Sequence, residues 1–506
     1  MKKSFFFIYF LLFNFLISNT ISSQENTKSD TSNPNTSNYQ KLIYRLDSLA
    51  NANQTLLKYS NFSMAVYSLN SNQMIFSRNA DKPVKPASVT KLITCFVTYS
   101  LVGDSFKIKT QFYTNDKDLD DKIINGNLYI RGFGDCTQKL EDLDEIVRQL
   151  KSIGIKKITG DIIADGTFFD EVNNRFHYSG DEDEVEPTAL ISALSLENNR
   201  IKIVVNTKVV GEPKVQVIPY SPSINVVIKN LGSPTPTQIK TKRKKPVKPQ
   251  TTRPKIFSKL DERGYQNITI SGRFAKNASL YFEEFNHNPV LSYAGAVFYR
   301  LNNNGISVEG KFTKLTDRNS QDYSKFTILG EISKPINLLI NEMNKKSNNY
   351  YAENLFKFNA ATADKDKLLS NSAQMLLDSL IYTYFGNYKH DIKIYDGSGL
   401  SRRNRLSASL LVEILKHITK TNYFGSFLSS LAIAGRDGTL EKRMRGTSAE
   451  LKVFAKTGTH RDVSSLSGIV QTNEGEIFLF AFLFNGGGVG SYKLFENQMC
   501  EIIASY

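Results

Sequence analysis

Helical and strand-like patterns alternate in blocks along the chain. Apolar residues recur at helical spacing in segments that include 39–53, 335–363, 372–386, 407–420 and 492–506. From about 107 to 316 the pattern changes to short alternating apolar runs separated by turn residues, which is typical of strands. The pattern therefore predicts β-rich material inserted between helical segments.

Further strand signals flank the helical segments. Residues 61–84 hold two alternating apolar runs around the turn 70–73, which predicts a hairpin. The apolar run 477–484 follows the turn 473–476 and predicts a strand that is buried on both faces beside an antiparallel neighbour. Together the patterns predict an α+β protein with an antiparallel sheet flanked by helices.

The first residues have the pattern of a signal peptide. Lys2 and Lys3 precede the apolar stretch 5–17, small polar residues follow, and we assign 1–23 to the signal. Residues 24–38 are rich in Ser, Asn and Thr, which predicts a disordered spacer. No later stretch holds about 18 apolar residues, so we expect an exported protein without a transmembrane anchor, periplasmic or extracellular and associated with the cell wall.

The net charge of +15 is partly concentrated in one segment rich in Pro and Lys. Its basic residues are Lys240, Lys242, Arg243, Lys244, Lys245, Lys248, Arg253, Lys255 and Lys259. Such a segment cannot build a core, so its simplest interpretation is a flexible loop without a specific ligand. The alternative is that 240–259 contacts an anionic wall or membrane surface. We expect no nucleic-acid partner.

Cysteine and histidine usage weakens several function classes. The three cysteines, Cys95, Cys136 and Cys500, are an odd number with no close CxxC pair, which disfavours a disulfide scaffold and a zinc ribbon. The five histidines are scattered, without an HExxH arrangement, which disfavours a metalloenzyme. We therefore expect neither a metal nor a cofactor.

Ser88 and Lys91 form a candidate nucleophile and base. Pro86 precedes a run with apolar positions at helical spacing, so the two side chains should share one face at a helix N-terminus. A serine hydroxyl needs a base, and a lysine kept neutral by its environment can serve as that base. In isolation the same residues would be a helix N-cap beside a solvated lysine.

Two further motifs follow in order. Ser347 and Asn349 form an SxN triplet between helical segments, and Lys456, Thr457 and Gly458 form a KTG triplet on a predicted edge-type strand. SxxK, SxN and KTG in this order are the serine acyl-transferase set of penicillin-binding proteins and β-lactamases. Alone, the SxN triplet could be a polar loop and the KTG triplet a strand-end turn.

From about Tyr39 onward the sequence resembles the low-molecular-mass penicillin-binding proteins of the D-alanyl-D-alanine carboxypeptidase/endopeptidase family. The resemblance rests on the three motifs, on the long gap between the first two, and on the blocks 341–357, 395–407, 432–444 and 454–468. It implies a penicillin-binding-protein/serine β-lactamase-like domain interrupted by two β-rich domains. The implied divisions are a peptidase domain at 39–107 and 331–506, an inserted domain II at 108–186 and 271–330, and an inserted domain III at 187–270 that includes the basic loop 233–259.

The resemblance also implies roles for single residues. Ser88 would attack the carbonyl carbon of the bond after a D-alanine while Lys91 takes its proton, and Ser347 would relay the proton to the departing amine. Asn349 would contact Lys91 and the substrate backbone. The residues expected to bind the terminal carboxylate or line the oxyanion hole are Lys456, Thr457, Gly458 and Thr459, the last through its N–H group together with that of Ser88. Lys456 near Lys91 would help to keep Lys91 neutral.

The resulting hypothesis is an exported serine D,D-peptidase that acts on peptidoglycan stem peptides and binds β-lactam antibiotics covalently. This hypothesis does not decide between carboxypeptidase activity, endopeptidase activity or both. The alternatives to it are a serine β-lactamase and a catalytically inactive wall-binding protein. Residues 396–399 read as a scaffold turn, and the acidic run 181–186 reads as a solvated loop in preference to a metal or glycosidase site.

Overall fold

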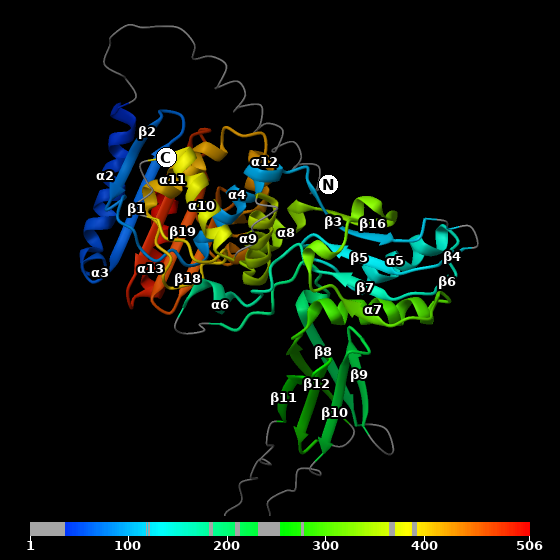
Figure 1. Cartoon of the computed structure of the whole chain (residues 1–506). Coiled ribbons are helices and arrows are strands. Elements are labelled where there is room, and N and C mark those ends of the chain that lie inside the picture. The colour runs from blue at the N-terminus through cyan, green and yellow to red at the C-terminus, as the bar shows by residue number, and fades with distance from the viewer. Residues whose placement is uncertain are drawn as a thin grey trace, which may run out of the picture. The chain divides into compact units, whose positions relative to one another are not determined.

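The computed structural model forms two compact units. It describes residues 36–117, 119, 122–181, 186–207, 213–230, 254–274, 278–363, 370–386 and 392–506. Unit 1 comprises Met1–Val89 and Leu406–Tyr506, and unit 2 comprises Thr90–Arg405 (Figure 1). The predicted signal peptide and residues 24–35 lie outside the described residues. Residues 36–38, which the sequence assigned to the spacer, form the start of helix α2 (Thr36–Ala52).

Unit 1 is built on a six-stranded sheet in which every pairing is antiparallel. In spatial order its strands are β17 (Ala432–Ile433), β18 (Val453–His460), β19 (Val463–Gln471), β20 (Ile477–Asn485), β1 (Asn61–Ser68) and β2 (Gln73–Arg78). The predicted hairpin is therefore β1–β2. The short β17 pairs only with Phe454 and Ala455 of β18, so the KTG part of β18 extends past this neighbour.

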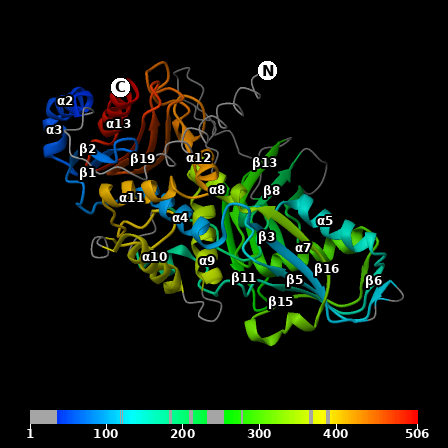
Figure 2. The ribbon, with the colours of Figure 1, turned by 90° about the horizontal axis from the view of Figure 1, so that it is seen from above.

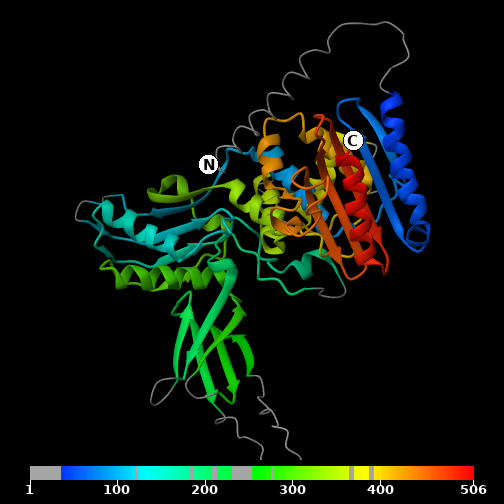
Figure 3. The same cartoon turned by 180° about the vertical axis from the view of Figure 1, so that it is seen from behind.

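Helices flank this sheet. Helix α11 (Ala408–Ile418) packs against β1 and β20, whereas α13 (Val489–Ala504) packs against β19 and α2. Figure 2 shows α11 and α13 on opposite faces of the sheet, and Figure 3 shows α13 in front of the strands. The unit also contains the shorter helices α3 (Gln54–Lys58) and α12 (Phe424–Ser430). An antiparallel sheet flanked by helices is the predicted architecture, and it is confirmed.

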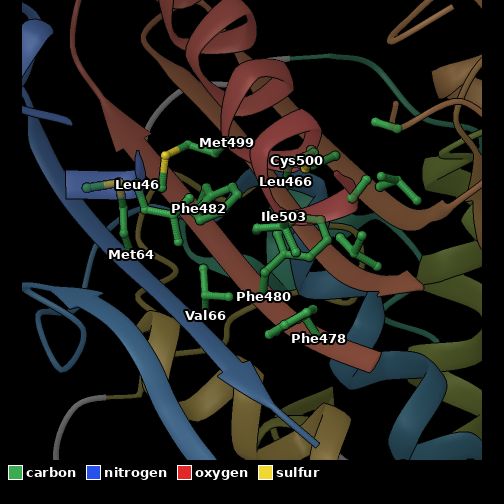
Figure 4. Close-up of a cluster of buried hydrophobic side chains, with 14 of the residues drawn as sticks. Leu46, Met64, Val66, Leu466, Phe478, Phe480, Phe482, Met499, Cys500 and Ile503 are labelled. Atoms are coloured by element: carbon green, nitrogen blue, oxygen red, sulfur yellow. The ribbon is translucent and has the colours of Figure 1, made fainter. Parts of the chain in front are cut away.

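The main core of unit 1 lies between the sheet and the α2–α13 face (Figure 4). Phe478, Phe480 and Phe482 alternate along β20 and pack with Leu46 of α2 and Ile503 of α13. All nine residues of β20 are buried, which confirms the prediction of a strand covered on both faces. Full burial of one such phenylalanine stabilises the fold by about 1.5–3 kcal/mol.

Unit 2 contains a five-stranded mixed sheet. Its strands, in spatial order, are β15 (Phe312–Lys314), β7 (Ile162–Asp165), β5 (Leu128–Gly132), β3 (Lys107–Thr114) and β16 (Thr327–Pro335). Helices α5 (Leu140–Ser152) and α7 (Pro289–Asn303) pack against it and against each other. Unit 2 also contains a small sheet of β14 (Ser307–Val308), β6 (Lys157–Ile158) and β4 (Ile123–Ile124). Each of these strands comes directly before a strand of the larger sheet in the chain.

Two three-stranded sheets in unit 2 share a second core. One is β10 (Ile224–Asn230), β12 (Gln266–Gly272) and β11 (Lys255–Leu260), and the other is β13 (Ser279–Phe285), β8 (Arg200–Asn206) and β9 (Lys214–Ile218). Ile203 of β8 and Ile268 and Ile270 of β12 lie in that core. β13 pairs with β8 across the predicted domain boundary at 270/271. The residue boundaries of the two inserted domains remain a prediction.

The basic loop predicted at 233–259 is partly a strand. Residues 233–253 lie outside the described residues, but Lys255–Leu260 form β11, which is hydrogen-bonded to β12. The reason is the alternation around Ile256, whose side chain packs against the core while Lys255 and Lys259 are exposed. A segment that looks uniformly polar by composition therefore contains a half-buried strand at its end.

A group of helices in unit 2 carries Lys91 of the first candidate motif and Asn349 of the second. These helices are α4 (Lys91–Val102), α8 (Ile336–Lys345), α9 (Asn349–Ala363) and α10 (Ser370–Phe385), which pack against one another. The described residues also form the short helices η1 (Ala87–Thr90), α6 (Arg175–Ser179), η2 (Glu197–Asn199), η3 (Arg318–Ser320), η4 (Tyr323–Lys325) and η6 (Gly438–Leu440). Among the described residues, no helix has the length and apolarity needed to span a membrane. All three cysteines are buried and free.

Candidate active site

Ser88 lies in the 3₁₀ turn η1, which runs directly into α4. Its side chain is half-buried, whereas those of its neighbours Ala87 and Val89 are buried. Ala87 has a φ of +48°, a backbone conformation that non-glycine residues rarely adopt and that structures tend to retain at functional sites. The sequence predicted Ser88 in the first turn of an α-helix, but the α-helical part begins at Lys91.

The segment that leads to Ser88 is anchored inside unit 1. Val84 forms a β-bridge with Leu406, and the backbone N–H and C=O of Lys85 both bond to the side chain of Asn485, at 2.8 and 2.9 Å. The Lys85 ammonium also pairs with Asp462 at 2.5 Å, in the turn between β18 and β19. These contacts fix the backbone just before Ser88 to the ends of β18, β19 and β20.

Strand β18 passes the backbone of Ser88 at close range. A Cβ atom on Gly458 would lie 2.7 Å from the carbonyl oxygen of Pro86 and 3.0 Å from the Ser88 nitrogen. Only glycine permits this approach, so the glycine of the KTG triplet has a steric cause. Unit 1 therefore brings Gly458 of the KTG triplet close to the backbone of Ser88.

The other residues of the KTG strand differ in exposure. Lys456 is fully buried, and its ammonium donates to the carbonyl of Thr457 at 2.9 Å. The Thr457 hydroxyl bonds to that of Thr439 at 2.7 Å, which links β18 to the short helix η6. Thr459 is exposed. A buried cation followed by an exposed strand end is a suitable arrangement for holding a carboxylate ligand.

Lys91 belongs to unit 2 and is completely buried. Its Nζ atom donates to Asn349 Oδ1 at 2.8 Å and to the carbonyl oxygen of Ser398 at 2.6 Å. Burial lowers the Lys91 pKa to about 7, against the opposing influence of the carboxylates of Glu353, Asp396 and Glu186. A lysine of this kind can change its charge near neutral pH. The sequence predicted that Lys456 would help to keep Lys91 neutral, whereas the main cause of the lowered pKa in the structure is desolvation.

Ser347 and Asn349 lie where α8 gives way to α9. Ser347 is half-buried in the connection and has a φ of +56°, again in the left-handed region. Asn349 is the first residue of α9, and its Nδ2 group donates to Glu186 Oε2 at 3.1 Å. Unit 2 therefore brings Asn349 to Lys91, as predicted.

Several residues around Lys91 were not predicted as part of the site. The 396–399 segment is a turn, as expected, but its Ser398 carbonyl contacts Lys91. The acidic run 181–186 was predicted as a solvated loop, but its two described residues have partners: Asp181 is paired with the buried Arg175 at 2.7 Å, and Glu186 accepts from Asn349. Glu353 bonds to the backbone N–H of Ser398 at 2.8 Å. The sequence offered one signal for Glu353: it lies four residues after Asn349, a spacing that places both side chains on the same face of a helix.

The sheet with its flanking helices, the β-rich insertions and the three ordered motifs define a penicillin-binding-protein type of fold. The family model described as "D-Ala-D-Ala carboxypeptidase 3 (S13) family" matches residues 44–506. The chain belongs to this family, and it is therefore an enzyme, a hydrolase of the serine-type D-Ala-D-Ala carboxypeptidase class.

Individual relatives agree with this assignment. The chain is 26% identical over 461 residues to D-alanyl-D-alanine carboxypeptidase DacB of Haemophilus influenzae, covering 89% of this chain and 91% of that protein. It is also 26% identical to the D-alanyl-D-alanine carboxypeptidase of an Actinomadura species, covering 85% of this chain and 79% of that protein. The crystal structure of penicillin binding protein 4 from H. influenzae has the same fold, with a TM-score of 0.70, 23% identity and coverage of 91% and 99%.

Proposed function

We propose that the protein is an exported serine D,D-peptidase that cleaves peptidoglycan stem peptides through an acyl-enzyme on Ser88. The observation that carries this proposal is the state of Lys91, a fully buried amine with a pKa of about 7, held by two oxygen atoms, three residues after a serine. A solvated lysine could not act as a base near neutral pH, whereas this one can.

The proposed acylation begins with Ser88. Its Oγ atom bonds to the carbonyl carbon of the peptide bond after a D-alanine, and neutral Lys91 takes the hydroxyl proton. The N–H groups of Ser88 and Thr459 stabilise the charge on the carbonyl oxygen. The close approach of Gly458 to the Ser88 nitrogen supports this pairing, because it holds strand β18 beside that N–H group.

The remaining residues complete the reaction. The peptide C–N bond breaks, Ser347 passes the proton to the departing amine, and Asn349 holds Lys91 and the substrate backbone. Lys456 and Thr457 bind the terminal carboxylate of the substrate. A water molecule then adds to the acyl carbon, the ester bond between that carbon and Ser88 Oγ breaks, and Oγ takes up a proton from the water, which releases the shortened peptide. A β-lactam acylates Ser88 by the same attack, with opening of its ring.

The product formed from defined muropeptides tests the proposal. We expect the mature protein to release D-alanine from a stem pentapeptide, to cleave a D,D-crosslinked dimer, or to do both, and benzylpenicillin should abolish either reaction. Mass spectrometry separates these products, and free D-alanine identifies carboxypeptidase action. Rapid repeated turnover of nitrocefin without peptide cleavage would instead support a β-lactamase. A folded protein that forms no product and no penicillin adduct would contradict the proposal and favour an inactive wall-binding protein.

We also propose a periplasmic or extracellular location at the cell wall, with an anionic wall or membrane surface as a contact of the basic segment 240–259. Residues 240–253 lie outside the described residues, but the rest of the segment supports the idea. Lys255 and Lys259 of this segment, together with Lys229 of β10, lie on the outer face of the β10–β12–β11 sheet, around the exposed Phe257. None of the outward positions 225, 227, 229, 255, 257, 259, 267, 269 and 271 is acidic.

Sedimentation with purified sacculi tests this contact. We expect the wild-type protein to co-sediment and the triple variant of Lys229, Lys255 and Lys259 to Gln to lose several-fold in affinity, because exposed charges act additively and are screened by salt. The binding should weaken as salt rises and should survive Ser88→Ala. Anionic vesicles distinguish a membrane contact from a wall contact. Equal binding of wild type and triple variant at every salt concentration would exclude this face as the contact.

A further inference from the structure

A fully buried carboxylate lies next to Lys91 without belonging to any of the three motifs. Glu353 is on α9, four residues after Asn349, so both side chains lie on one face of the helix. Its Oε1 atom accepts the Ser398 N–H at 2.8 Å, and its Oε2 atom accepts the Gly397 N–H at 3.3 Å and the Tyr178 hydroxyl at 2.6 Å. Backbone N–H groups can only donate, so this geometry suits the carboxylate form.

Glu353 thereby ties α9 to the turn that contacts Lys91. The Ser398 N–H is held by Glu353, while the Ser398 carbonyl accepts from Lys91 at 2.6 Å. The next N–H, that of Gly399, is held by Asp396 Oδ1 at 2.9 Å. The turn also packs directly on the helix, since a Cβ atom on Gly397 would lie 2.6 Å from the Ala352 carbonyl oxygen. The Ser398 carbonyl is thus fixed from both sides.

Two acceptors of Lys91, Asn349 Oδ1 and the Ser398 oxygen, restrict the direction of its lone pair. A neutral amine has two protons and one lone pair, and an amide oxygen and a backbone carbonyl can only accept. When Asn349 Oδ1 and the Ser398 oxygen take both protons, the lone pair must point away from them. α9 provides both restraints, one directly through Asn349 and one through Glu353 and Ser398.

We propose that Glu353 is a positioning residue for acylation: by holding the Ser398 backbone it orients the lone pair of neutral Lys91. The inference rests on the proposed role of Lys91 as base. Glu353 does not touch the reacting atoms, so its effect passes through Ser398 and through its charge.

Other charged groups surround this arrangement. Lys91 faces Glu353 on α9, Asp396 in the 396–399 turn, and Glu186 at the end of the acidic run 181–186. Glu353 in turn faces Tyr178 and Arg175 on α6, Asp396, and Lys357 one turn further along α9. Burial and Asp396 raise the Glu353 pKa, and Arg175 opposes them. The negative charge of Glu353 raises the Lys91 pKa, so its removal should lower that pKa further.

The pH dependence of penicillin acylation tests the proposal. In the wild type, the second-order rate constant should rise as pH increases through about 7, because Lys91 must lose its proton to act as a base. In Glu353→Gln the midpoint should move to lower pH, since a charge that favours protonated Lys91 is gone. The plateau should fall about 10- to 100-fold, because the single amide oxygen cannot hold both N–H groups and the base is misplaced.

A second variant separates charge from geometry and covers the case in which Glu353→Gln does not fold. Glu353→Asp keeps the charge but is one methylene shorter, so its midpoint should stay near that of the wild type while its plateau falls. Glu496→Gln is a matched control, because Glu496 is equally buried on α13 and bonds to Ser464 and Arg443. It should lower the melting temperature without moving the midpoint.

The outcomes distinguish this inference from the proposed function. An unmoved midpoint and an unchanged plateau in folded Glu353→Gln, or a wild-type plateau in Glu353→Asp, would overturn the positioning role alone. A wild-type protein that penicillin never acylates would instead refute the function on which the inference rests.

Discussion

Replacing Ser88 by alanine is expected to abolish the covalent penicillin adduct and to reduce peptide cleavage by about 10⁴-fold or more, the order seen when a serine hydrolase loses its nucleophile. Ser88 is half-buried and follows the strained Ala87, so loss of its hydroxyl should change the chemistry more than the packing. A fluorescent penicillin, visible as a band on a denaturing gel, reads out the adduct. Release of D-alanine gives the rate.

A matched serine elsewhere separates chemistry from folding. Ser105→Ala alters an exposed residue just after α4 and should label like the wild type. The melting temperatures of Ser88→Ala and of the wild type should agree within a few degrees. A Ser88→Ala protein that still forms the adduct would show that another residue is the nucleophile, and the mechanism built on Lys91 would fall with it.

The sequence predicted the parts of this enzyme whose cause is local. Burial of β20 on both faces follows from its unbroken apolar run, and the hairpin β1–β2 follows from alternation around a turn. The motifs could be found because nucleophile, base and anion-binding residues are contributed by short stretches of chain. Ser88 and Lys91 are only three residues apart, so a single helical turn is enough to place them on the same face.

The sequence could not predict what depends on contacts between distant segments. Burial of Lys91 depends on the packing of α4, α8 and α9, so desolvation as the main cause of its lowered pKa was not visible. The role of Ser398 depends on its carbonyl, which every residue type possesses. The acidic run 181–186 has the composition of a solvated loop, yet Asp181 is fixed by the buried Arg175. β11 was missed because only one of its residues, Ile256, shows a clear inward preference.

The glycine of the KTG triplet gives the second large effect. In Gly458→Ala the new methyl group would lie 2.7 Å from the Pro86 oxygen, 3.0 Å from the Ser88 nitrogen and 3.1 Å from the Val89 nitrogen. All three are backbone atoms, which cannot rotate out of the way as a side chain could. The segment before Ser88 is held by Lys85 and Asn485, and β18 is hydrogen-bonded to β19 along its length, so neither partner can yield without breaking other bonds.

We therefore expect Gly458→Ala to displace β18 from Ser88 and to slow penicillin acylation by about 10²-fold or more, comparable to the loss of one oxyanion-hole donor. Overpacking should also lower stability, by about 1–3 kcal/mol in chemical denaturation. Gly487→Ala is the control, because its methyl group would meet nothing within 4 Å. Its acylation rate and its free energy of unfolding should both equal those of the wild type. Stopped-flow acylation kinetics on folded protein separate the two effects. A wild-type rate in Gly458→Ala would mean that the Ser88 N–H and β18 do not act together on the developing oxyanion.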